Sequence, residues 1–374
     1  MSLALTLGVE EEYLLVNLET YELAPEPPPE LMEKLKAALG ENVTGELYRS
    51  QIEVMTPVCT TVAAADRELR RLRRGVADIC AEFGLAPMAA STHPLAAWRD
   101  QVQVHNERYD RLVGELGGIV SRYLICGLHV HLGVLDPDLR ISVLQALRPF
   151  LPYFLAFTTS SPYWQGDDTR VKSYRLSVAH SLPRTGMPDD FGDFETYQRF
   201  VDVLIETGLV EDATVLWWDV RPSAKFPTLE LRVCDACPRI GDALAIVALY
   251  QSLVSALIRT GEVESAGGVA LPLIKENLWR AQRFGFDLGF LDYHEPKLIS
   301  GPDMIRCLID RVREDAERLE CMEWLAELER LPERGTSADR QRRLYAQARD
   351  DGADHHEALS RIVRALVTET MEGC

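Results

Sequence analysis

Polar and apolar residues follow strand-like patterns mainly in the first two thirds of the chain, whereas helical patterns dominate after about residue 238. Side chains alternate between two faces along a strand and return to one face roughly every 3.6 residues along a helix. These patterns predict strands over residues 5–17, 46–56, 85–90, 123–134, 214–221 and 226–233. They predict helices over residues 31–39, 62–83, 98–114, 137–158, 194–209, 242–259, 271–284, 302–331 and 354–372.

This order of elements predicts an α+β fold, in which helices cover one face of a mainly antiparallel sheet. The 374 residues show no internal repeat, no low-complexity tract and no linker, so we expect a single domain over residues 1–374 that is rich in helices after about residue 238. The segment Gly166–Asp193 has few periodic apolar residues. We expect a long loop there, and loops of that length are often functional.

The formal net charge of −18 makes nucleic acids and anionic membranes poor partners for this chain. The N-terminus has no basic region, and acids follow soon after it, so no signal peptide is expected. The longest apolar run, Leu244–Ile258, is interrupted by Gln251 and is judged too short to span a bilayer. These features predict a cytoplasmic protein.

The eight cysteines are scattered, with no spacing typical of a disulfide framework, which also favours a reducing cytoplasm. Cys234 and Cys237 form the one Cys-x-x-Cys pattern. A zinc knuckle would need a second pair of ligands nearby, and a redox motif would need a thioredoxin-like setting. We therefore expect two buried thiols at the end of a strand.

Three consecutive glutamates stand in an otherwise apolar strand, in the segment Gly8–Val16. Because side chains alternate along a strand, Glu10 and Glu12 leave one face and Glu11 leaves the other. Two like charges on one face repel each other, and a sheet face normally buries apolar groups there. Divalent metal ions bound together with phosphate are the natural compensation. The alternative is an edge strand with solvated acids.

Three further predicted strands carry polar residues on one face. His129 and His131 lie two residues apart, as do Glu230 and Arg232, while Glu53 lies in a strand that is otherwise apolar at alternate positions. Taken singly, the histidines fit a packing feature and the Glu–Arg pair fits a surface ion pair. Together with the glutamate strand they predict a concave wall that binds hard cations, because a dry core excludes such residues. Mostly carboxylate ligands with a histidine favour Mg²⁺ or Mn²⁺ over Zn²⁺.

Four sequence motifs occur in a fixed order along the chain. They are Gly-Val-Glu-Glu-Glu-Tyr-Leu-Leu-Val at residues 8–16, Gly-Leu-His-Val-His-Leu-Gly at 127–133, Trp-Trp-Asp-Val-Arg-Pro-Ser at 217–223 and Thr-Leu-Glu-Leu-Arg-Val-Cys-Asp at 228–235. Together they resemble the glutamate–cysteine ligase type 2 family, and within it the bacterial YbdK-type carboxylate–amine ligases. The resemblance spans residues 7 to about 240. It implies a glutamine synthetase-like catalytic fold and an ATP-dependent ligase.

The resemblance also implies a ligand set, cofactors and substrates. On the pattern of glutamine synthetase-like enzymes, the residues that bind divalent metal ions are Glu10, Glu12, Glu53, His129 and Glu230. Related enzymes use one more carboxylate shortly after the Glu53 position, but residues 55–58 of this chain contain no acid, so that ligand is not placed. The implied cofactors are ATP and Mg²⁺ or Mn²⁺. The implied substrates are L-glutamate as the acyl donor and cysteine or another amine as the acceptor.

The segment Gly166–Arg175 is also similar to the family and concentrates two aspartates, one threonine and three cationic residues. We assign substrate binding there to Asp168, Thr169 and Arg175, with a solvated loop as the alternative. His131 is a further predicted substrate-binding residue.

Three arginines are the predicted catalytic residues: Arg232, Arg221 and Arg175. The resemblance implies that Arg232 faces the transferred phosphoryl group, and Arg221 or Arg175 would assist it in stabilising charge. Trp217 and Trp218 are expected in the core.

The combined interpretation is an ATP-dependent carboxylate–amine ligase that forms an amide through an acyl phosphate. No Gly-Lys pair, Gly-x-Gly or Gly-x-Ser-x-Gly occurs in the chain, which excludes nucleotide binding by a P-loop. The alternatives are a metal-dependent amide hydrolase and a non-catalytic nucleotide-binding protein. The expected partners are small-molecule carboxylate and amine substrates, and a homodimer is compatible with the sequence.

Overall fold

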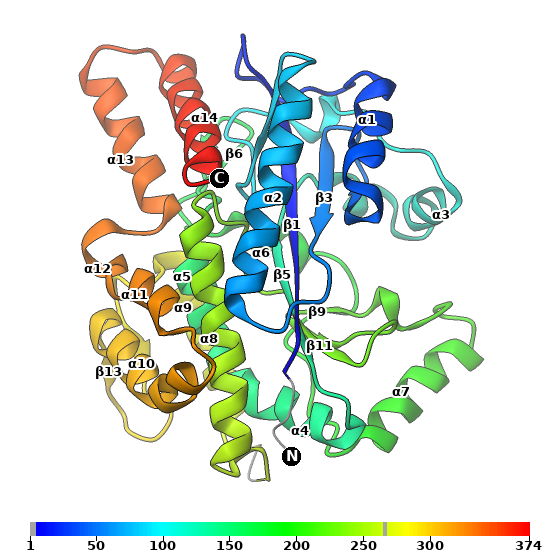
Figure 1. Ribbon diagram of the computed structural model, residues 1–374, viewed down its shortest axis with the longest axis vertical. Helices are drawn as coiled ribbons and strands as arrows, with labels where there is room; N and C mark the ends of the chain where they lie inside the picture. Colours follow the sequence, from blue (N-terminus) through cyan, green and yellow to red (C-terminus); the bar gives the residue numbers. More distant parts are fainter. Residues whose placement is uncertain (1–4, 265–267) are drawn as a thin grey trace.

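An antiparallel sheet of seven strands lies at the centre of the protein (Figure 1). The computed structural model describes residues 5–264 and 268–374. The strands follow the order β10-β11-β5-β1-β3-β2, and β4 pairs with the end of β1. Their bounds are β1 (Leu7–Asn17), β2 (Val43–Gly45), β3 (Gln51–Met55), β4 (Leu85–Met88), β5 (Leu128–Gly133), β10 (Val220–Pro222) and β11 (Thr228–Leu231). The antiparallel pairing confirms the predicted α+β class.

The pairing register divides the side chains of this sheet between an apolar face and a polar face. Val130 of β5 pairs with Val9 on one side and with Leu231 on the other, and all three are buried. This apolar face packs against α2 (Val62–Ala81) and α8 (Ile240–Arg259), which lie beside β1 and β5 in Figure 1. Burial of apolar surface stabilises the folded state by roughly 25 cal/mol per Å². This gain determines which face of each strand packs against the helices.

Glu11 leaves β1 on the covered face, opposite to its two neighbouring glutamates, as predicted. Its buried carboxylate forms an ion pair with Arg73 of α2, with nitrogen–oxygen distances of 2.6 and 2.8 Å. Tyr13 donates a hydrogen bond of 2.6 Å to the same carboxylate. Arg73 also donates to three carbonyl oxygens, which belong to Cys237, Pro238 and Thr370. The pair therefore ties β1 to distant parts of the chain.

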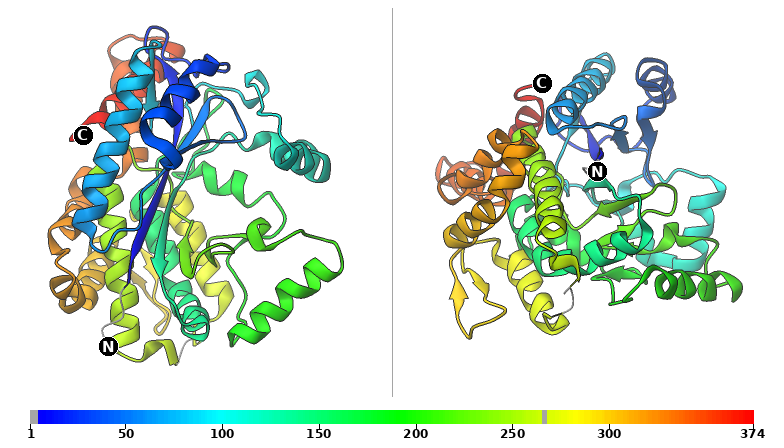
Figure 2. Two further views of the ribbon diagram at one scale, coloured as in Figure 1. Left: turned by 45° about the vertical axis from the view of Figure 1, so that its right-hand side comes forward. Right: turned by 60° about the horizontal axis from the view of Figure 1, so that its bottom comes forward.

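Helices dominate after residue 238, as predicted. They lie on the side of the protein opposite to α3 (Glu107–Leu116) and α7 (Phe194–Glu206) (Figures 1 and 2). After α8 they are α9 (Leu271–Phe284), α10 (Gly301–Arg318), α11 (Met322–Glu329), α12 (Leu331–Arg334), α13 (Ser337–Asp350) and α14 (His355–Met371), with the strand pair β12 (Phe290–Leu291) and β13 (Leu298–Ile299) between α9 and α10. The prediction of one helix over residues 302–331 was wrong, because Glu320 adopts a φ of 54° and interrupts the helical path.

Helix α13 was not predicted, because no apolar stripe marks it in the sequence. Its buried residues are small or polar: Ser337, Ala338, Arg340, Gln341 and Ala348. Arg340 is held by an ion pair with Glu369 of α14 at 2.8 Å. Tertiary contacts therefore support this helix where its own periodicity does not.

Several predicted elements are shorter than their sequence pattern indicates. The predicted strand over residues 46–56 contains a turn before β3. The predicted helix over residues 137–158 is divided into α4 (Pro137–Leu147) and α5 (Leu151–Thr158), because two prolines remove backbone donors between them. The predicted helix over residues 98–114 is a short 3₁₀ helix followed by α3 (Glu107–Leu116).

The remaining elements are short or peripheral. The helices are α1 (Pro29–Leu39), α6 (Tyr174–Ala179) and α7 (Phe194–Glu206), and the two-residue strands are β6 (Tyr163–Trp164), β7 (Asp167–Asp168), β8 (Thr185–Gly186) and β9 (Trp217–Trp218). The 3₁₀ helices are Gly40–Asn42, Trp98–Asp100, Gly117–Arg122, Arg148–Phe150, Ala213–Val215 and Glu262–Glu264. The expected long loop over residues 166–193 therefore contains β7, α6 and β8.

The cysteines are free thiols in this structure. Cys234 and Cys237 are buried directly after β11, which confirms the prediction of two buried thiols at the end of a strand.

Two helical stretches are long and apolar enough to cross a membrane by length and composition, namely Pro137–Thr158 and Ile240–Arg259. The helix that contains the apolar run Leu244–Ile258 is longer than the run itself and extends over 20 residues. Of their most apolar windows, 83% and 94% are buried inside the protein, and the core helices of soluble proteins pass the same test.

Candidate active site

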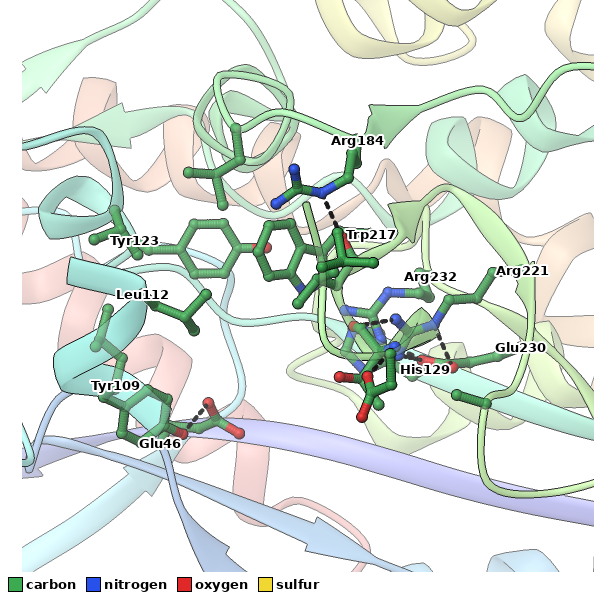
Figure 3. A pocket seen from close by; sticks show the side chains of 18 of the residues that line it. Glu46, Tyr109, Leu112, Tyr123, His129, Arg184, Trp217, Arg221, Glu230 and Arg232 are labelled. Atoms are coloured by element: carbon green, nitrogen blue, oxygen red, sulfur yellow. Dashed lines mark hydrogen bonds and ion pairs between the residues drawn. The ribbon is translucent and has the colours of Figure 1, made fainter. Parts of the chain in front are cut away.

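A cavity of about 1210 Å³ lies over the polar face of the sheet (Figure 3). Ligand pockets commonly hold roughly 300–1,000 Å³, so this cavity has room for more than one small molecule. Polar side chains of β1, β3, β5 and β11 form its floor. Its walls come from α3 and from the segment 208–217, which are joined by an ion pair between Arg111 and Glu211.

All five predicted metal ligands converge on the floor of this cavity, in two groups. The first group is Glu10, His129 and Glu230, and the second is Glu12, Glu53 and His129. Within each group, one ligand atom from every residue lies within 4.8 Å of the others. The strand register explains the grouping, because Glu10 lies opposite His129 and Glu12 lies opposite Glu53 in neighbouring strands. One imidazole therefore stands between two sets of acids.

The second group is buried and strongly acidic. Burial, together with the charge of Glu46, raises the pKa of Glu12 to about 8. Burial and the same neighbouring charge raise the pKa of Glu53 well above its usual value. Acids that repel one another in a site shielded from water are an arrangement that a divalent cation stabilises.

The first group is balanced by histidines and arginines of the protein. Burial alone would raise the pKa of Glu10, but hydrogen bonds from His129 and His131 outweigh it and hold that pKa well below its usual value. Burial and the charge of Arg232 lower the pKa of His129 to about 4. The His129 imidazole is therefore neutral at pH 7 and has a lone pair for a metal ion. Carboxylates with one neutral imidazole fit Mg²⁺ or Mn²⁺.

Glu46 is a cavity residue that the sequence analysis did not identify. In a continuous strand over residues 46–56, Glu46 and Glu53 would point to opposite faces, because they lie an odd number of positions apart. The chain instead turns between β2 and β3 and brings Glu46 into the cavity lining with Glu12 and Glu53. Tyr109 of α3 donates a hydrogen bond of 3.4 Å to Glu46. The additional carboxylate beside the second group is therefore Glu46, which precedes Glu53 in the sequence, whereas related enzymes have theirs after the Glu53 position.

Two arginines flank the buried carboxylate of Glu230 (Figure 3). Arg221 Nε lies 2.8 Å from one carboxylate oxygen, and Arg232 forms an ion pair with the other. Burial alone would raise the pKa of Glu230, but the two guanidinium groups outweigh it and lower that pKa. Arg221 is also fixed by the carbonyl oxygens of Thr214 and Leu216, at 2.9 and 3.0 Å. The site therefore holds two arginines in rigid positions beside the first acid group.

Comparison with known sequences decides the family of this chain. A family profile described as glutamate-cysteine ligase family 2 matches residues 6–365. The chain belongs to the glutamate–cysteine ligase family 2. The "Putative glutamate--cysteine ligase 2" of Rhodospirillum rubrum is 46% identical over 373 residues, which cover 98% of this chain and 96% of the relative. The relative of the same name from Jannaschia sp. is 44% identical over 365 residues, which cover 97% of this chain and 96% of the relative.

Two solved structures share the fold of this member of glutamate–cysteine ligase family 2. A bifunctional glutathione synthetase from Pasteurella multocida has a TM-score of 0.71 at 14% identity, with 99% of this chain and 53% of that chain covered. This chain thus spans about half the length of that protein. A glutamate–cysteine ligase from Francisella tularensis, solved in complex with AMP, has a TM-score of 0.70 at 14% identity, with 99% of this chain and 90% of that chain covered. These likenesses confirm the predicted glutamine synthetase-like fold.

Membership in glutamate–cysteine ligase family 2 also confirms the predicted class of reaction. The chain is an ATP-dependent ligase that joins a carboxylate to an amine.

Arg175 is the third arginine at the floor of the cavity of this ligase. Its guanidinium donates to the carbonyl oxygens of Arg232 at 3.0 Å and of Val233 at 3.3 Å. Gly127 leaves room for it, since a Cβ at that position would lie 2.5 Å from Arg175 Nη2. The backbone N–H of Gly127 also donates a hydrogen bond of 2.7 Å to Glu12. Close packing at this glycine therefore places Arg175 beside the second acid group.

Asp235 holds the chain segments that support Arg175. Its buried carboxylate accepts hydrogen bonds from the Ser160 backbone N–H at 2.9 Å and from the Ser161 and Ser173 hydroxyls, each at 2.8 Å. The Ser161 oxygen in turn accepts the backbone N–H of Arg175 at 3.1 Å. Asp235 is therefore a positioning residue, one that acts through Ser161 and Ser173.

We predict that Asp235→Asn lowers turnover about 10²-fold, because an amide cannot accept all three hydrogen bonds and a displacement of about 1 Å is that costly. ATP should still bind with a near-native Kd, which isothermal titration calorimetry can measure beside kcat and KM. Asp315→Asn is the matched control, since Asp315 is equally buried but bonds to Ser255, Arg259 and Arg318, none of which lines the cavity. Full turnover in Asp235→Asn would contradict the positioning role.

Asp168 and Thr169 do not lie with the other predicted site residues. Asp168 is exposed and forms an ion pair with Arg342 at 2.8 Å, and the Thr169 hydroxyl donates to the carbonyl oxygen of Pro162 at 2.8 Å. Neither residue is part of the cavity lining. Their polar groups hold the β7 turn to its neighbours, so we leave both out of the proposed substrate site.

His131 lies in the cavity but outside both acid groups. Its Nδ1 is 2.9 Å from Thr228 Oγ1, and its Nε2 is 3.1 Å from Glu10 Oε1. Its role in substrate binding stays a prediction. Of the two tryptophans expected in the core, Trp218 is buried there, whereas Trp217 lines the cavity.

Proposed function

We propose that this ligase joins L-glutamate to cysteine or another amine, with Mg²⁺ or Mn²⁺ as the metal cofactor. The observation that carries the proposal is the pair of acid groups that share one histidine, beside a carboxylate flanked by two arginines. When bound, the ions would neutralise charge on the phosphate oxygens of ATP. One ion would be held by Glu10 and Glu230, and the other by Glu12, Glu53 and the nearby Glu46. The single lone pair of the neutral His129 imidazole would bind one of the two ions.

The arginines of the chain would then stabilise and orient the reacting groups. In the first step an oxygen of the donor carboxylate attacks the terminal phosphorus of ATP, the bond to ADP breaks, and an acyl phosphate forms. Arg232 and Arg221 would stabilise the charge on the transferred group, and Arg175 would orient the donor. In the second step the amine nitrogen attacks the acyl carbon and loses a proton, inorganic phosphate leaves, and the amide forms.

Release of ADP and phosphate by the full chain tests this function. We expect ADP release with ATP, Mg²⁺, L-glutamate and a panel of amines, and only when both the carboxylate and an amine are present. An amide hydrolase would instead cleave γ-glutamyl amides without ATP, and a non-catalytic nucleotide-binding protein would bind ATP without turnover. Either of these outcomes would contradict the proposal.

We predict that Glu10→Gln and Glu12→Gln each remove one of two bound Mn²⁺ ions, because the two residues belong to different acid groups. Electron paramagnetic resonance of free Mn²⁺ during titration would count the ions bound by each variant. Glu68→Gln, a change on the surface of α2, is the control and should leave both ions bound. Two bound Mn²⁺ ions in either test variant would contradict the assignment. Anomalous density joining an ion to His131 and not to His129 would overturn the choice of histidine.

We further propose that residues 1–374 act as one catalytic domain in the cytoplasm, without a nucleic-acid or membrane partner. The net charge of −18 and the burial of both long apolar helices support this. A homodimer is the assembly to test, and sedimentation velocity of the full chain would measure it.

A further inference from the structure

The cavity has a second end, whose chemistry differs from that of the acidic floor. Figure 3 shows Tyr123, Trp217 and Leu112 there, away from the Glu230 cluster, with the guanidinium of Arg184 on one side of the two aromatic rings. The residues of this aromatic end are Leu112, Tyr123, Arg184 and Trp217. Tyr109 lies between this end and the acidic floor, where it donates a hydrogen bond to Glu46. None of the steps of phosphoryl transfer described above uses it.

The backbone of Arg184 is fixed in an unusual conformation at this aromatic end. Its φ is 60°, in the left-handed region that residues with a side chain seldom adopt. Its carbonyl oxygen accepts the backbone N–H of Trp217 at 2.9 Å, and the next residue, Thr185, pairs with Trp217 between β8 and β9. Strained backbone of this kind persists only where the surrounding structure enforces it, and it clusters at ligand sites.

The guanidinium of Arg184 has donors to spare for a ligand. Nε donates a long hydrogen bond of 3.4 Å to the carbonyl oxygen of Val215, and the guanidinium carbon lies 5.8 Å from the centroid of the Trp217 ring. Within residues 5–264 and 268–374, no carboxylate forms an ion pair with Arg184, in contrast to Arg221 and Arg232. A guanidinium carries five N–H donors in a planar fork.

We propose that Arg184 binds a free carboxylate of an amino-acid substrate, and that Leu112, Tyr123 and Trp217 pack against the rest of that substrate. The planar fork matches a carboxylate with two parallel hydrogen bonds, and the tryptophan ring holds the cation in place. This inference rests on the proposed function, in which the reacting carboxylate lies at the acidic floor. The carboxylate at Arg184 is then a second, non-reacting one, which belongs either to the donor or to an amino acid that supplies the amine.

The test removes the guanidinium of Arg184 and measures which substrate then binds more weakly. Arg184→Ala is the main variant, and Arg184→Gly is the second, because glycine accepts a positive φ without strain. Arg99→Ala is the matched control, since the Arg99 guanidinium also stacks on a tryptophan, 4.2 Å from the Trp98 ring centroid, but lies outside the cavity lining. Isothermal titration calorimetry would measure the Kd of L-glutamate. Turnover would be compared for cysteine and for cysteamine, which lacks the carboxylate, together with the KM for ATP.

The loss of a charge-assisted hydrogen bond should weaken the binding of the recognised amino acid about 10- to 100-fold. If Arg184 binds the carboxylate of the acceptor, kcat/KM for cysteine falls to the cysteamine level and the Kd of L-glutamate stays constant. If Arg184 binds the carboxylate of the donor, the Kd of L-glutamate rises, and kcat/KM falls by the same factor for cysteine and for cysteamine. Arg184→Lys should recover only part of the loss.

Three results would overturn the inference. The first is an unchanged Kd for L-glutamate together with an unchanged kcat/KM for cysteine in the Arg184 variants. The second is a change that is confined to the KM for ATP. The third is a native chain that neither binds L-glutamate nor prefers cysteine to cysteamine. A native chain that binds L-glutamate but releases no ADP with any amine would refute the proposed function, and the Kd values of the Arg184 variants would still decide the role of Arg184.

Discussion

Arg232→Ala should lower kcat by about 10³-fold or more, because an arginine on a transferring phosphoryl group contributes a factor of that size. ATP should still bind with nearly native affinity, since the metal ions carry most of the contacts to its phosphates. The fold should also survive, because Arg221 remains as a cationic partner for the buried Glu230 carboxylate. Phosphate release at saturating ATP and Mg²⁺ measures kcat, and calorimetry measures the Kd of ATP.

Two further variants make the test of Arg232 specific. Arg232→Lys should rescue little, because a point charge does not reproduce the planar fork of a guanidinium. Arg283→Ala removes an arginine that stacks on Phe284 outside the cavity lining, and it should leave kcat unchanged. Near-normal turnover in Arg232→Ala would refute the role, and a collapsed melting temperature would instead make Arg232 a structural partner of Glu230.

Arg73→Met should lower the free energy of unfolding by about 3–5 kcal/mol, the usual cost of leaving one partner of a buried ion pair alone. Glu11 would then stand uncompensated on the apolar face of β1. Among residues 5–264 and 268–374, the Tyr13 hydroxyl would be its one remaining side-chain donor. The change would also free three carbonyl oxygens that Arg73 now satisfies. Urea denaturation followed by circular dichroism measures the loss.

A surface arginine on the same helix provides the matched control for Arg73. Arg71 pairs with Glu68 at 2.9 Å, but the two side chains are 47% and 31% exposed. Arg71→Met should therefore cost no more than about 1 kcal/mol. The double variant Glu11→Met with Arg73→Met should recover part of the stability, because no unpaired charge remains. Equal losses for Arg71→Met and Arg73→Met would contradict this account of β1.

The sequence by itself determined the features that depend on neighbouring positions in one strand. The alternation along β1 was sufficient to place Glu10 and Glu12 on one face and Glu11 on the other, because the period of two is a property of the extended backbone. The order of four short motifs was sufficient for the family, and with it the class of reaction. The helical periodicity of apolar residues over long segments likewise predicted most of α2, α8, α9 and α14.

Only the tertiary structure decided which distant residues meet. Antiparallel pairing of β5 with β1 sets His129 between two acid groups, and a turn before β3 brings Glu46 to the same cavity. The burial of Asp235 among three serine groups and the left-handed backbone of Arg184 leave no periodic signal in the chain. These features depend on strand register, turns and packing between segments far apart, which local periodicity does not encode.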